Sequence, residues 1–337
     1  MSNPYLLSVR LMVYNHENYI REAIEGILIQ KTNFPIEVVI GDDFSTDKSL
    51  AIIKEYQNTP QIHFKILDRK VGDDYWQNRQ KIGRLHNFYN ILENCSGKYI
   101  ALLDGDDFWT DPLKLQKQVD FLETNDDFSI CFHNMNISNQ ANLTSNELTN
   151  TKDQESVTTI VDLAQKGNFL FTASVVFRKP TMGYPEWLIE LPIGDYPIHL
   201  YHAQFGKIKY LNQVMGVYRV HESGAWGVFS KETQYEKWIP TLTNLKNRFT
   251  HEVNIQLNYQ MKNALFDLYL IANSQGKKEK AAECIAKLME SDVNYIARKI
   301  NKSETMLRNT LNSKAYKLGK MILHIVAVPT LIFKNKK

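Results

Sequence analysis

The sequence predicts an α/β protein with a mostly parallel central sheet, helices flanking that sheet, and a helical extension at the C-terminus. From Leu6 to Glu123, short apolar runs alternate with segments whose apolar residues recur at helical spacing. Polar or acidic loops follow several of the predicted strands, and from about Lys231 the pattern turns helical. Alternating strands and helices are typical of a parallel sheet, which binds ligands at the carboxyl ends of its strands.

The first part of the chain repeats a strand-loop-helix pattern. The first strand is followed by Tyr14-Asn15-His16-Glu17-Asn18, and the second by the polar loop Gly41-Asp42-Asp43-Phe44-Ser45-Thr46-Asp47. In chain order, the predicted strands are 6–13, 36–40, 62–67 and 99–103, and the predicted helices are 20–28, 50–56 and 83–94. The loop at Asp42 and the residues that follow the fourth strand are therefore expected at the same edge of the sheet.

An acidic turn ends the fourth strand. The apolar run Tyr99–Leu103 is followed by Asp104, Asp106 and Asp107, with Gly105 allowing a close turn. Carboxylates this close repel one another and raise each other's pKa unless a cation or strong donors lie nearby. Oxygen ligands suit Mg²⁺ or Mn²⁺, which usually keep coordination places for substrate phosphates. The alternative is a structural acidic turn before the helix that Asp111-Pro112 begins.

Composition and charge narrow the class of protein. Of the 337 residues, 23% are charged and 43% hydrophobic, as is usual for a folded soluble protein. The three cysteines are far apart without a CxxC pair, which favours a reducing compartment and argues against a zinc site. Without a predicted secretory signal, a cytoplasmic location is expected. The net charge is +3, but six lysines and no acidic residue lie between Lys314 and Lys337, so nucleic-acid binding by the rest of the chain is not expected.

The second half of the chain has weaker patterns. The prediction is a helix at 113–123, strands at 129–133 and 173–178, a helix from Asp195 to about residue 206, and a helical hairpin of 257–273 and 278–289. Residues 134–156 are rich in polar side chains and are predicted to form a mobile loop or a lid. The domain prediction is a catalytic domain at 1–228, with halves at 1–107 and 108–228, and an extension at 229–337.

The motifs together resemble those of family 2 glycosyltransferases with the GT-A fold. The residues that carry this resemblance are Val13-Tyr14-Asn15-His16-Glu17, the loop Gly41 to Asp47, and Leu103-Asp104-Gly105-Asp106-Asp107. Each motif is weak alone, but their order, and the predicted strand before each, make the combination specific. The resemblance covers roughly the first third of the chain and implies inverting transfer of a sugar from a nucleotide-sugar donor. One departure is Met12, where many members have proline.

The resemblance also assigns roles to particular residues. Asp104 and Asp106 match the DxD motif that holds the metal on the donor diphosphate, and Asp107 and His221 are expected to complete the metal site. Asp195, at the start of its helix, matches the base that removes the acceptor proton, although a helix N-cap explains it nearly as well. The expected donor-binding residues are Tyr14, Asn15, Glu17, Asp43, Arg84, Asn87, Asp104 and Arg219.

The expected reaction is transfer of a single sugar, with Mn²⁺ or Mg²⁺, from a nucleotide-diphosphate sugar, most simply a UDP-sugar. The acceptor would be a hydroxyl of a glycan or lipid-linked molecule in surface-polysaccharide assembly. Gln234-Tyr235-Glu236-Lys237-Trp238 is close to the QxxRW motif of processive synthases, but Lys replaces Arg and the membrane helices of those enzymes are missing. A sugar nucleotidyltransferase and a non-catalytic nucleotide-sugar-binding module remain as alternatives.

The C-terminal tail suggests one more partner. The apolar run 321–333 is flanked by lysines and is too short to cross a bilayer, which needs about 20 residues. It is expected either to lie on an anionic membrane surface or to pack on the core with its basic end in solvent. The first alternative would place the protein on the inner face of the cell membrane.

Overall fold

The computed structural model describes residues 4–60, 62–139, 147–222, 224, 226–227, 229–292, 294–299 and 301. The chain divides into two compact units, residues 1–261 and 262–337. The division falls inside helix α9 (His251–Ser274), so the first unit extends beyond residue 228, where the catalytic domain was predicted to end.

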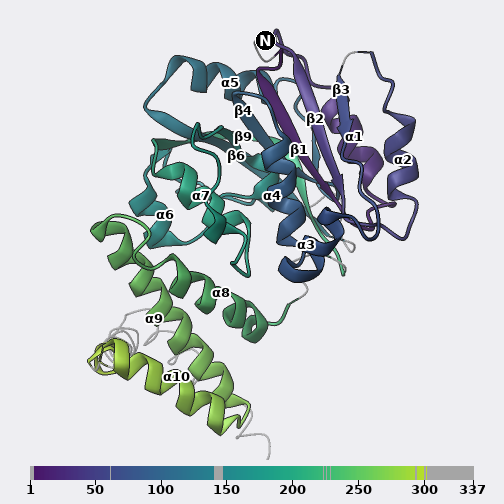
Figure 1. The fold of residues 1–337 in the computed structure, drawn as a ribbon. Helices are drawn as coiled ribbons and strands as arrows, with labels where there is room; N and C mark the ends of the chain where they lie inside the picture. Colours follow the sequence, from purple (N-terminus) through teal and green to yellow (C-terminus); the bar gives the residue numbers. More distant parts are fainter. Residues whose placement is uncertain are drawn as a thin grey trace, which may run out of the picture. The chain divides into compact units, whose positions relative to one another are not determined.

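The first unit is built on one mixed sheet (Figure 1). Its four parallel strands lie in the order β3-β2-β1-β4. The antiparallel strand β8 then joins β4 to β6, which pairs in parallel with β9. The bounds are β1 Leu7–Val13, β2 Ile36–Asp42, β3 His63–Ile66, β4 Tyr99–Asp104, β5 Phe108–Trp109, β6 Phe128–Asn139, β7 Val157–Thr158, β8 Val176–Arg178 and β9 Lys207–Val220. The predicted α/β fold is confirmed, with parallel pairing throughout its first four strands.

Helices cover both faces of this sheet, and the alternation of side chains along each strand explains why. In β4, Ile100 and Leu102 belong to the core beneath α4 and α7, whereas Ala101 and Leu103 belong to the core beneath α1 and α5. A strand buried on both faces reads as a continuous apolar run, which is the pattern of this segment. The helices of the unit are α1 Ile20–Leu28, α2 Ser49–Glu55, α3 Asp74–Ile82, α4 Leu85–Asn94, α5 Lys114–Thr124, α6 Ile160–Lys166, α7 Asp195–Ala203 and α8 Lys231–Leu245.

The prediction of a loop from residue 134 is wrong for its first six residues. Strand β6 continues to Asn139 and pairs with β9, with Asn136 opposite Val217 and register shifts on either side of Asn134. The end of this strand was not predicted because its side chains are polar. These side chains form hydrogen bonds inside the protein. The side-chain oxygen Oδ1 of Asn134 accepts hydrogen bonds from the backbone N–H groups of Met135 and Asn150, both at 3.0 Å. The rest of the predicted loop includes 140–146, which lie outside the described residues.

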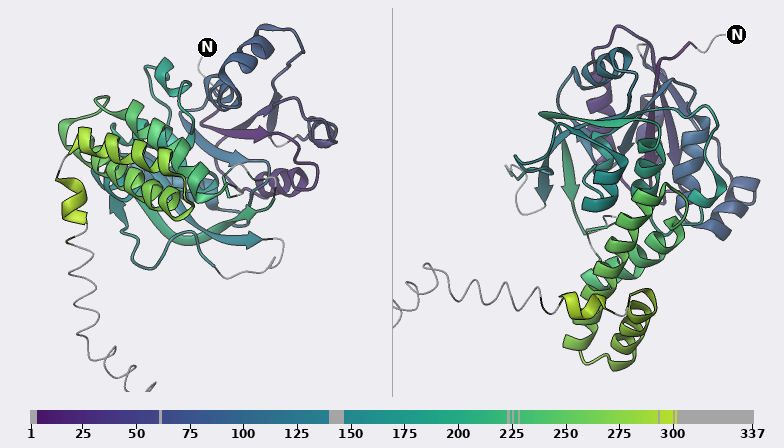
Figure 2. Two further views of the ribbon diagram at one scale, coloured as in Figure 1. Left: turned by 90° about the horizontal axis from the view of Figure 1, so that it is seen from below. Right: turned by 90° about the vertical axis from the view of Figure 1, so that its left-hand side faces the viewer.

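The described part of the second unit contains the end of α9 and helix α10 (Lys278–Ser291), coloured green to yellow in Figure 2. These are the two helices predicted at 257–273 and 278–289. Between them, Gly276 has a φ of +72°, a left-handed conformation that glycine adopts without steric cost. No helix among the described residues has the length and apolar character that crossing a membrane requires. The apolar tail at 321–333 lies outside the described residues.

Candidate active site

Three strand ends bring the predicted motifs to one edge of the sheet. Strand β1 lies between β2 and β4, with Met12 opposite both Gly41 and Asp104 and Val13 opposite Asp42. The loops that follow these strands therefore start side by side. This arrangement follows from parallel pairing, because all the carboxyl ends point the same way.

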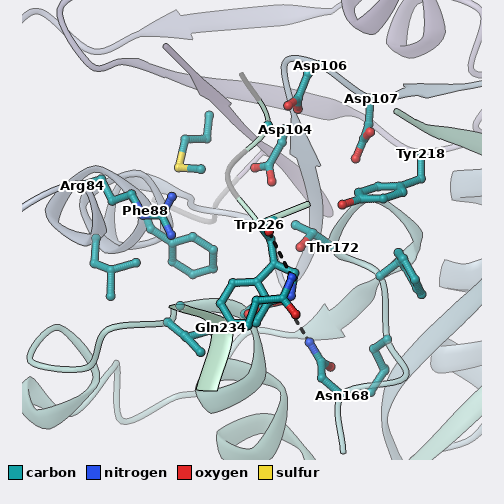
Figure 3. A pocket seen from close by; sticks show the side chains of 18 of the residues that line it. Arg84, Phe88, Asp104, Asp106, Asp107, Asn168, Thr172, Tyr218, Trp226 and Gln234 are labelled. Carbon is teal, nitrogen blue, oxygen red and sulfur yellow. Dashed lines mark hydrogen bonds between the residues drawn. The ribbon is translucent and has the colours of Figure 1, made fainter. Parts of the chain in front are cut away.

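A pocket of about 440 Å³ opens at this edge. Figure 3 shows Asp104, Asp106 and Asp107 on one side, Arg84 and Phe88 on another, and Asn168 at the far end. Of the predicted site residues, Arg84, Asp104, Asp106, Asp107, Asp195 and Arg219 line this pocket. Tyr14, Asn15, Glu17, Asp43 and Asn87 are not among its lining residues, and His221 reaches it through its contact with Asp106.

The acidic turn is held by contacts from three directions. Arg10, which is fully buried in β1, donates from Nη1 to Asp104 Oδ1 at 2.7 Å. The backbone N–H of Arg219 in β9 donates to Asp107 Oδ1 at 2.9 Å. A Cβ on Gly105 would lie 2.7 Å from His16 Nδ1, so only glycine lets this turn pack against the first loop. The two hydrogen bonds fix where the carboxylates of Asp104 and Asp107 point.

The carboxylates of the turn differ in their electrostatic state. Burial raises the pKa of Asp107 well above its usual range, and the neighbouring charges of Asp106 and Asp104 raise it further. Burial also opposes ionisation of Asp106, but the hydrogen bond from His221 and the nearby His16 outweigh it and lower the pKa of Asp106. The turn therefore places a carboxyl group whose neutral form is favoured, that of Asp107, beside a carboxylate that two imidazoles help to keep ionised, that of Asp106.

The chemistry of this cluster suits a divalent cation. Asp106 Oδ2 lies 3.1 Å from His221 Nε2 and 3.8 Å from His16 Nε2, and the carboxylate of Asp107 is next in the chain. Among the described residues no three such side chains are already arranged as a metal cage. However, a cation would relieve the repulsion that raises the Asp107 pKa, and mixed oxygen and nitrogen ligands are acceptable to Mn²⁺. Asp104 differs from the other ligand candidates because it already has a cationic partner in Arg10.

Asn15 and Glu17 tie the first loop to the second. The Asn15 side-chain oxygen accepts from the backbone N–H of Thr46 at 2.8 Å, and Glu17 Oε2 accepts from that of Lys48 at 3.0 Å. Asn15 adopts a φ of +54°, which asparagine tolerates better than most residues. Tyr14, in contrast, is 52% exposed and its ring is available to a ligand.

Asp43 and Asn87 are enclosed by side chains that the sequence analysis did not identify. The two carboxylate oxygens of Asp43 accept from Tyr75 Oη at 2.9 Å and Arg79 Nε at 2.7 Å, both from α3. Asn87 is 1% exposed and accepts from Arg69 Nη1 at 2.7 Å. Helix α3 was missed because it buries no residue, but its N-cap Asp73 and the glycine after its end, Gly83, were readable start and stop signals.

Asp195 begins α7 on the side of the pocket formed by the second half of the chain. Its Oδ2 accepts from Asn168 Nδ2 at 2.9 Å, and burial raises its pKa. The charge of Asp104 raises this pKa further, whereas Arg84 lowers it. A carboxylate with a raised pKa that faces a pocket has the properties of a general base.

Helix α8 supplies a wall of the pocket that the sequence analysis placed in the extension. Lys231, Gln234, Tyr235 and Trp238 line the pocket, together with Trp226 just before the helix. Trp238 stacks on Tyr196 with ring centroids 4.7 Å apart. Gln234 and Trp238 stand four residues apart and so share one helix face, but only tertiary packing brings that face to the pocket.

The comparison with known sequences agrees with this architecture. Residues 8–182 match the model of glycosyl transferase family 2. The chain is 37% identical over 221 residues to a Mycobacterium tuberculosis protein of uncharacterised function, covering 65% of this chain and 60% of the relative. It is 32% identical over 118 residues to the Bacillus subtilis protein TuaG, whose name assigns it to teichuronic acid biosynthesis, covering 35% of this chain and 42% of TuaG. The chain thus spans less than two thirds of the length of these relatives.

Two solved structures share the fold. S. aureus TarS (residues 1–349, with UDP-GlcNAc) superposes with a TM-score of 0.59 at 18% identity, covering 85% of this chain and 81% of that one. The mannosyltransferase PcManGT from Pyrobaculum calidifontis, with GDP-Man and Mn²⁺, has a TM-score of 0.54 at 14% identity and covers 100% and 89%. The fold is that of GT-A glycosyltransferases. The chain belongs to glycosyl transferase family 2.

Proposed function

We propose that the protein is a metal-dependent, inverting glycosyltransferase that moves one sugar from a nucleotide-diphosphate sugar to a hydroxyl group of an acceptor. The observation that carries this proposal is that Asp195 and the three carboxylates of the acidic turn line the same pocket. Donor and acceptor groups placed between them would meet inside a volume of about 440 Å³. The complexes of TarS with UDP-GlcNAc and of PcManGT with GDP-Man support a nucleotide-sugar donor, for which a UDP-sugar is the first choice.

The proposed reaction is a single displacement. Asp195 accepts the proton of the acceptor hydroxyl while its oxygen attacks the anomeric carbon from the face opposite the diphosphate. The bond from the anomeric carbon to the diphosphate oxygen breaks, and both its electrons leave with the nucleoside diphosphate. Arg84 and Arg219, which both line the pocket, would stabilise the negative charge of that leaving group.

The metal would be held by Asp106, Asp107 and His221, with Asp104 beside them. When bound, Mn²⁺ or Mg²⁺ neutralises charge on the diphosphate, a contribution of several kcal/mol. Imidazole in the ligand set favours Mn²⁺ over Mg²⁺. The Mn²⁺ in the PcManGT complex supports the same choice.

The donor nucleotide would extend from the acidic turn across the ends of β1 and β2. Tyr14 would lie on the base, and Asp43 would accept from the base or ribose. Asn15, Glu17 and Asn87 would act by holding the two loops and Arg69 in place, given their hydrogen bonds inside the protein.

The acceptor is proposed to be a glycan or a lipid-linked sugar. Trp226 and Trp238 bring aromatic faces to the pocket, on which the apolar face of a sugar ring can pack. The name of TuaG supports a role in surface-polysaccharide synthesis. We place the protein in the cytoplasm at the inner face of the membrane, with the lysine-rich tail attracted to anionic lipid.

The first experiment is calorimetric titration of the full chain with UDP, GDP, dTDP and CDP, each with and without Mn²⁺. The expected result is tight binding of one nucleotide that requires Mn²⁺ and is weakened at least tenfold in Asp106→Asn. Asp153→Asn, at an exposed aspartate, is the matched control and should bind as the wild type does. A nucleotide affinity that changes neither with Mn²⁺ nor in Asp106→Asn would overturn the proposed metal dependence.

The second experiment separates catalysis from binding. Asp195→Asn should retain nucleotide affinity but lose at least 10²-fold in kcat, since loss of a general base typically costs 10²–10⁴. The measurement is release of nucleoside diphosphate from the donor identified by calorimetry, with acceptor sugars present. An Asp195→Asn enzyme as fast as wild type would remove Asp195 as the base.

A further inference from the structure

Asp195 is the first member of a chain of three polar side chains. Asn168 Nδ2 lies 2.9 Å from Asp195 Oδ2, and Asn168 Oδ1 lies 3.0 Å from His199 Nδ1. Asp195 and His199 stand four residues apart on α7 and so project from the same face of the helix. Asn168 lies in the loop after α6 and bridges the two.

We propose that Asn168 and His199 are positioning residues that hold the Asp195 carboxylate toward the acceptor hydroxyl. This inference rests on the proposed role of Asp195 as the base. It adds two residues that lie outside the sequence motifs. The side-chain chemistry of the three groups determines how the chain of hydrogen bonds must run.

The direction of the hydrogen bonds follows from the ionised state of Asp195. A carboxylate only accepts, so the NH₂ group of Asn168 must face it and the amide oxygen must face His199. That oxygen in turn needs a donor, which only a protonated Nδ1 of His199 can supply. His199 is therefore the Nδ1–H tautomer, donating to Asn168, which donates to Asp195.

The surroundings of His199 agree with this tautomer. His199 is completely buried, and its Nε2 has no hydrogen-bond partner among the described residues. A buried N–H without an acceptor is rarer than an acceptor without a donor, so the unpartnered nitrogen is expected to carry no proton. Burial lowers the pKa of His199 to about 3, which keeps the imidazole neutral near pH 7.

The loop that carries Asn168 is itself fixed. Gly167 ends α6 with a φ of +86°, which turns the chain toward the pocket. On the other side, Asn150 Nδ2 donates to the carbonyl oxygen of Phe169 at 2.9 Å. Asn168 is therefore held on both sides by structure that does not depend on Asp195.

A neutral donor chain suits a base better than a cation would. The amide of Asn168 and the backbone N–H of Tyr196 restrain Asp195, the latter at 2.8 Å from Oδ1, without adding a positive charge that would weaken its basicity. The other charged and titratable groups near Asp195 are Asp104 of β4, Arg84 and Tyr89 of the α4 region and Tyr218 of β9. The remaining lone pairs of the Asp195 carboxylate are free to accept a hydrogen bond from the acceptor hydroxyl.

The test begins with a spectroscopic measurement that needs no substrate. In ¹⁵N-histidine-labelled full-length protein at pH 7.5, the ring-nitrogen shifts of His199, assigned by their loss in His199→Asn, should report the Nδ1–H tautomer. In Asn168→Leu, which lacks the side-chain amide, the ring-nitrogen shifts of His199 should no longer report the Nδ1–H tautomer alone. An Nε2–H tautomer in the wild type would overturn the proposal whether or not the protein transfers sugar.

Kinetics provide the second test. His199→Asn keeps an N–H donor near the position of Nδ1 and should retain most of kcat, whereas His199→Leu and Asn168→Leu should lose at least tenfold. Donor KM should stay within twofold in all three, and His63→Gln, at an exposed histidine, is the matched control. Equal kcat values for His199→Asn and His199→Leu would overturn the proposal. Undiminished turnover in Asp195→Asn would instead overturn the proposed base, a separate result.

Discussion

Arg10 shows how a single residue shapes the acidic turn. Its side chain is completely buried, contacts the ring of Phe88 with its guanidinium carbon 4.1 Å from the centroid, and ends on Asp104. The charge of Asp104 is thereby balanced by the guanidinium group of Arg10. Among the described residues, neither Asp106 nor Asp107 forms an ion pair with an arginine side chain. The carboxylates of the acidic turn are thus chemically unequal in this protein.

Replacing Arg10 with Met should lower the free energy of unfolding by about 3 kcal/mol, because it leaves Asp104 without its buried partner. Equilibrium unfolding in urea measures this change. Arg21→Met is the matched control, since the Arg21–Glu55 pair is about half exposed on both sides and should contribute little to stability.

A double-mutant cycle with Asp104→Asn separates the pair from the packing of Arg10. A coupling free energy above about 1 kcal/mol is expected for residues in direct contact. If Arg10→Met cost no more than Arg21→Met, the ion pair would contribute little to stability.

At the scale of the elements, close packing of β2 against α4 sets the base of the loop from Gly41 to Asp47. A Cβ on Gly41 would lie 2.4 Å from Ile91 Cγ1 and 2.5 Å from the side-chain oxygen of Asn87. The space that glycine leaves at this position is filled by α4. This contact places Asn87, and through it Arg69, beside the end of β2.

Gly41→Ala should therefore destabilise the protein by about 1–3 kcal/mol through overpacking. Gly227→Ala is the control, because its Cβ would meet nothing nearer than Val220 Cγ1 at 3.6 Å, and a change within about 0.5 kcal/mol is expected. Urea midpoints of both variants provide the comparison, and equal midpoints would show that α4 moves away without cost.

The elements also show what the sequence could and could not predict. Apolar runs predicted β1, β2 and β4, and the acidic turn was placed correctly because it directly follows one of them. Helix α3 and the end of β6 were missed, since the first buries no side chain and the second carries polar residues satisfied by distant partners. Asn168 and α8 join the pocket only through tertiary packing, and single-residue patterns carry no record of such contacts.

Considered as a whole molecule, the protein contains several neutral histidines in its interior. His133, His199 and His202 are at most 1% exposed. Burial lowers the pKa of His133 and of His199 to about 3, and that of His202 well below its usual value. In the unfolded chain these side chains would titrate near pH 6.5.

The unfolded state therefore binds more protons than the folded state below pH 6.5, so stability should be full above that pH and fall as the pH decreases. Each of the three residues contributes a slope of up to about 1.4 kcal/mol per pH unit. Urea unfolding at pH 7.5, 6.5 and 5.5 measures the loss. His133→Gln should reduce the slope by up to about 1.4 kcal/mol per pH unit, and an unchanged slope in His133→Gln would contradict this account.

The contacts that restrain the acidic turn come from far along the chain. His221 is 115 residues from Asp106, and Arg219 is 112 residues from Asp107. A ribosome releases the chain from its N-terminus, so β1 to β4 can pair while β9 has not yet been made. The nascent protein then carries its three carboxylates on a sheet without the strand that orients them. The proposed donor binding would therefore require that residue 221 has left the exit tunnel, and the proposed activity would begin only when synthesis is well advanced.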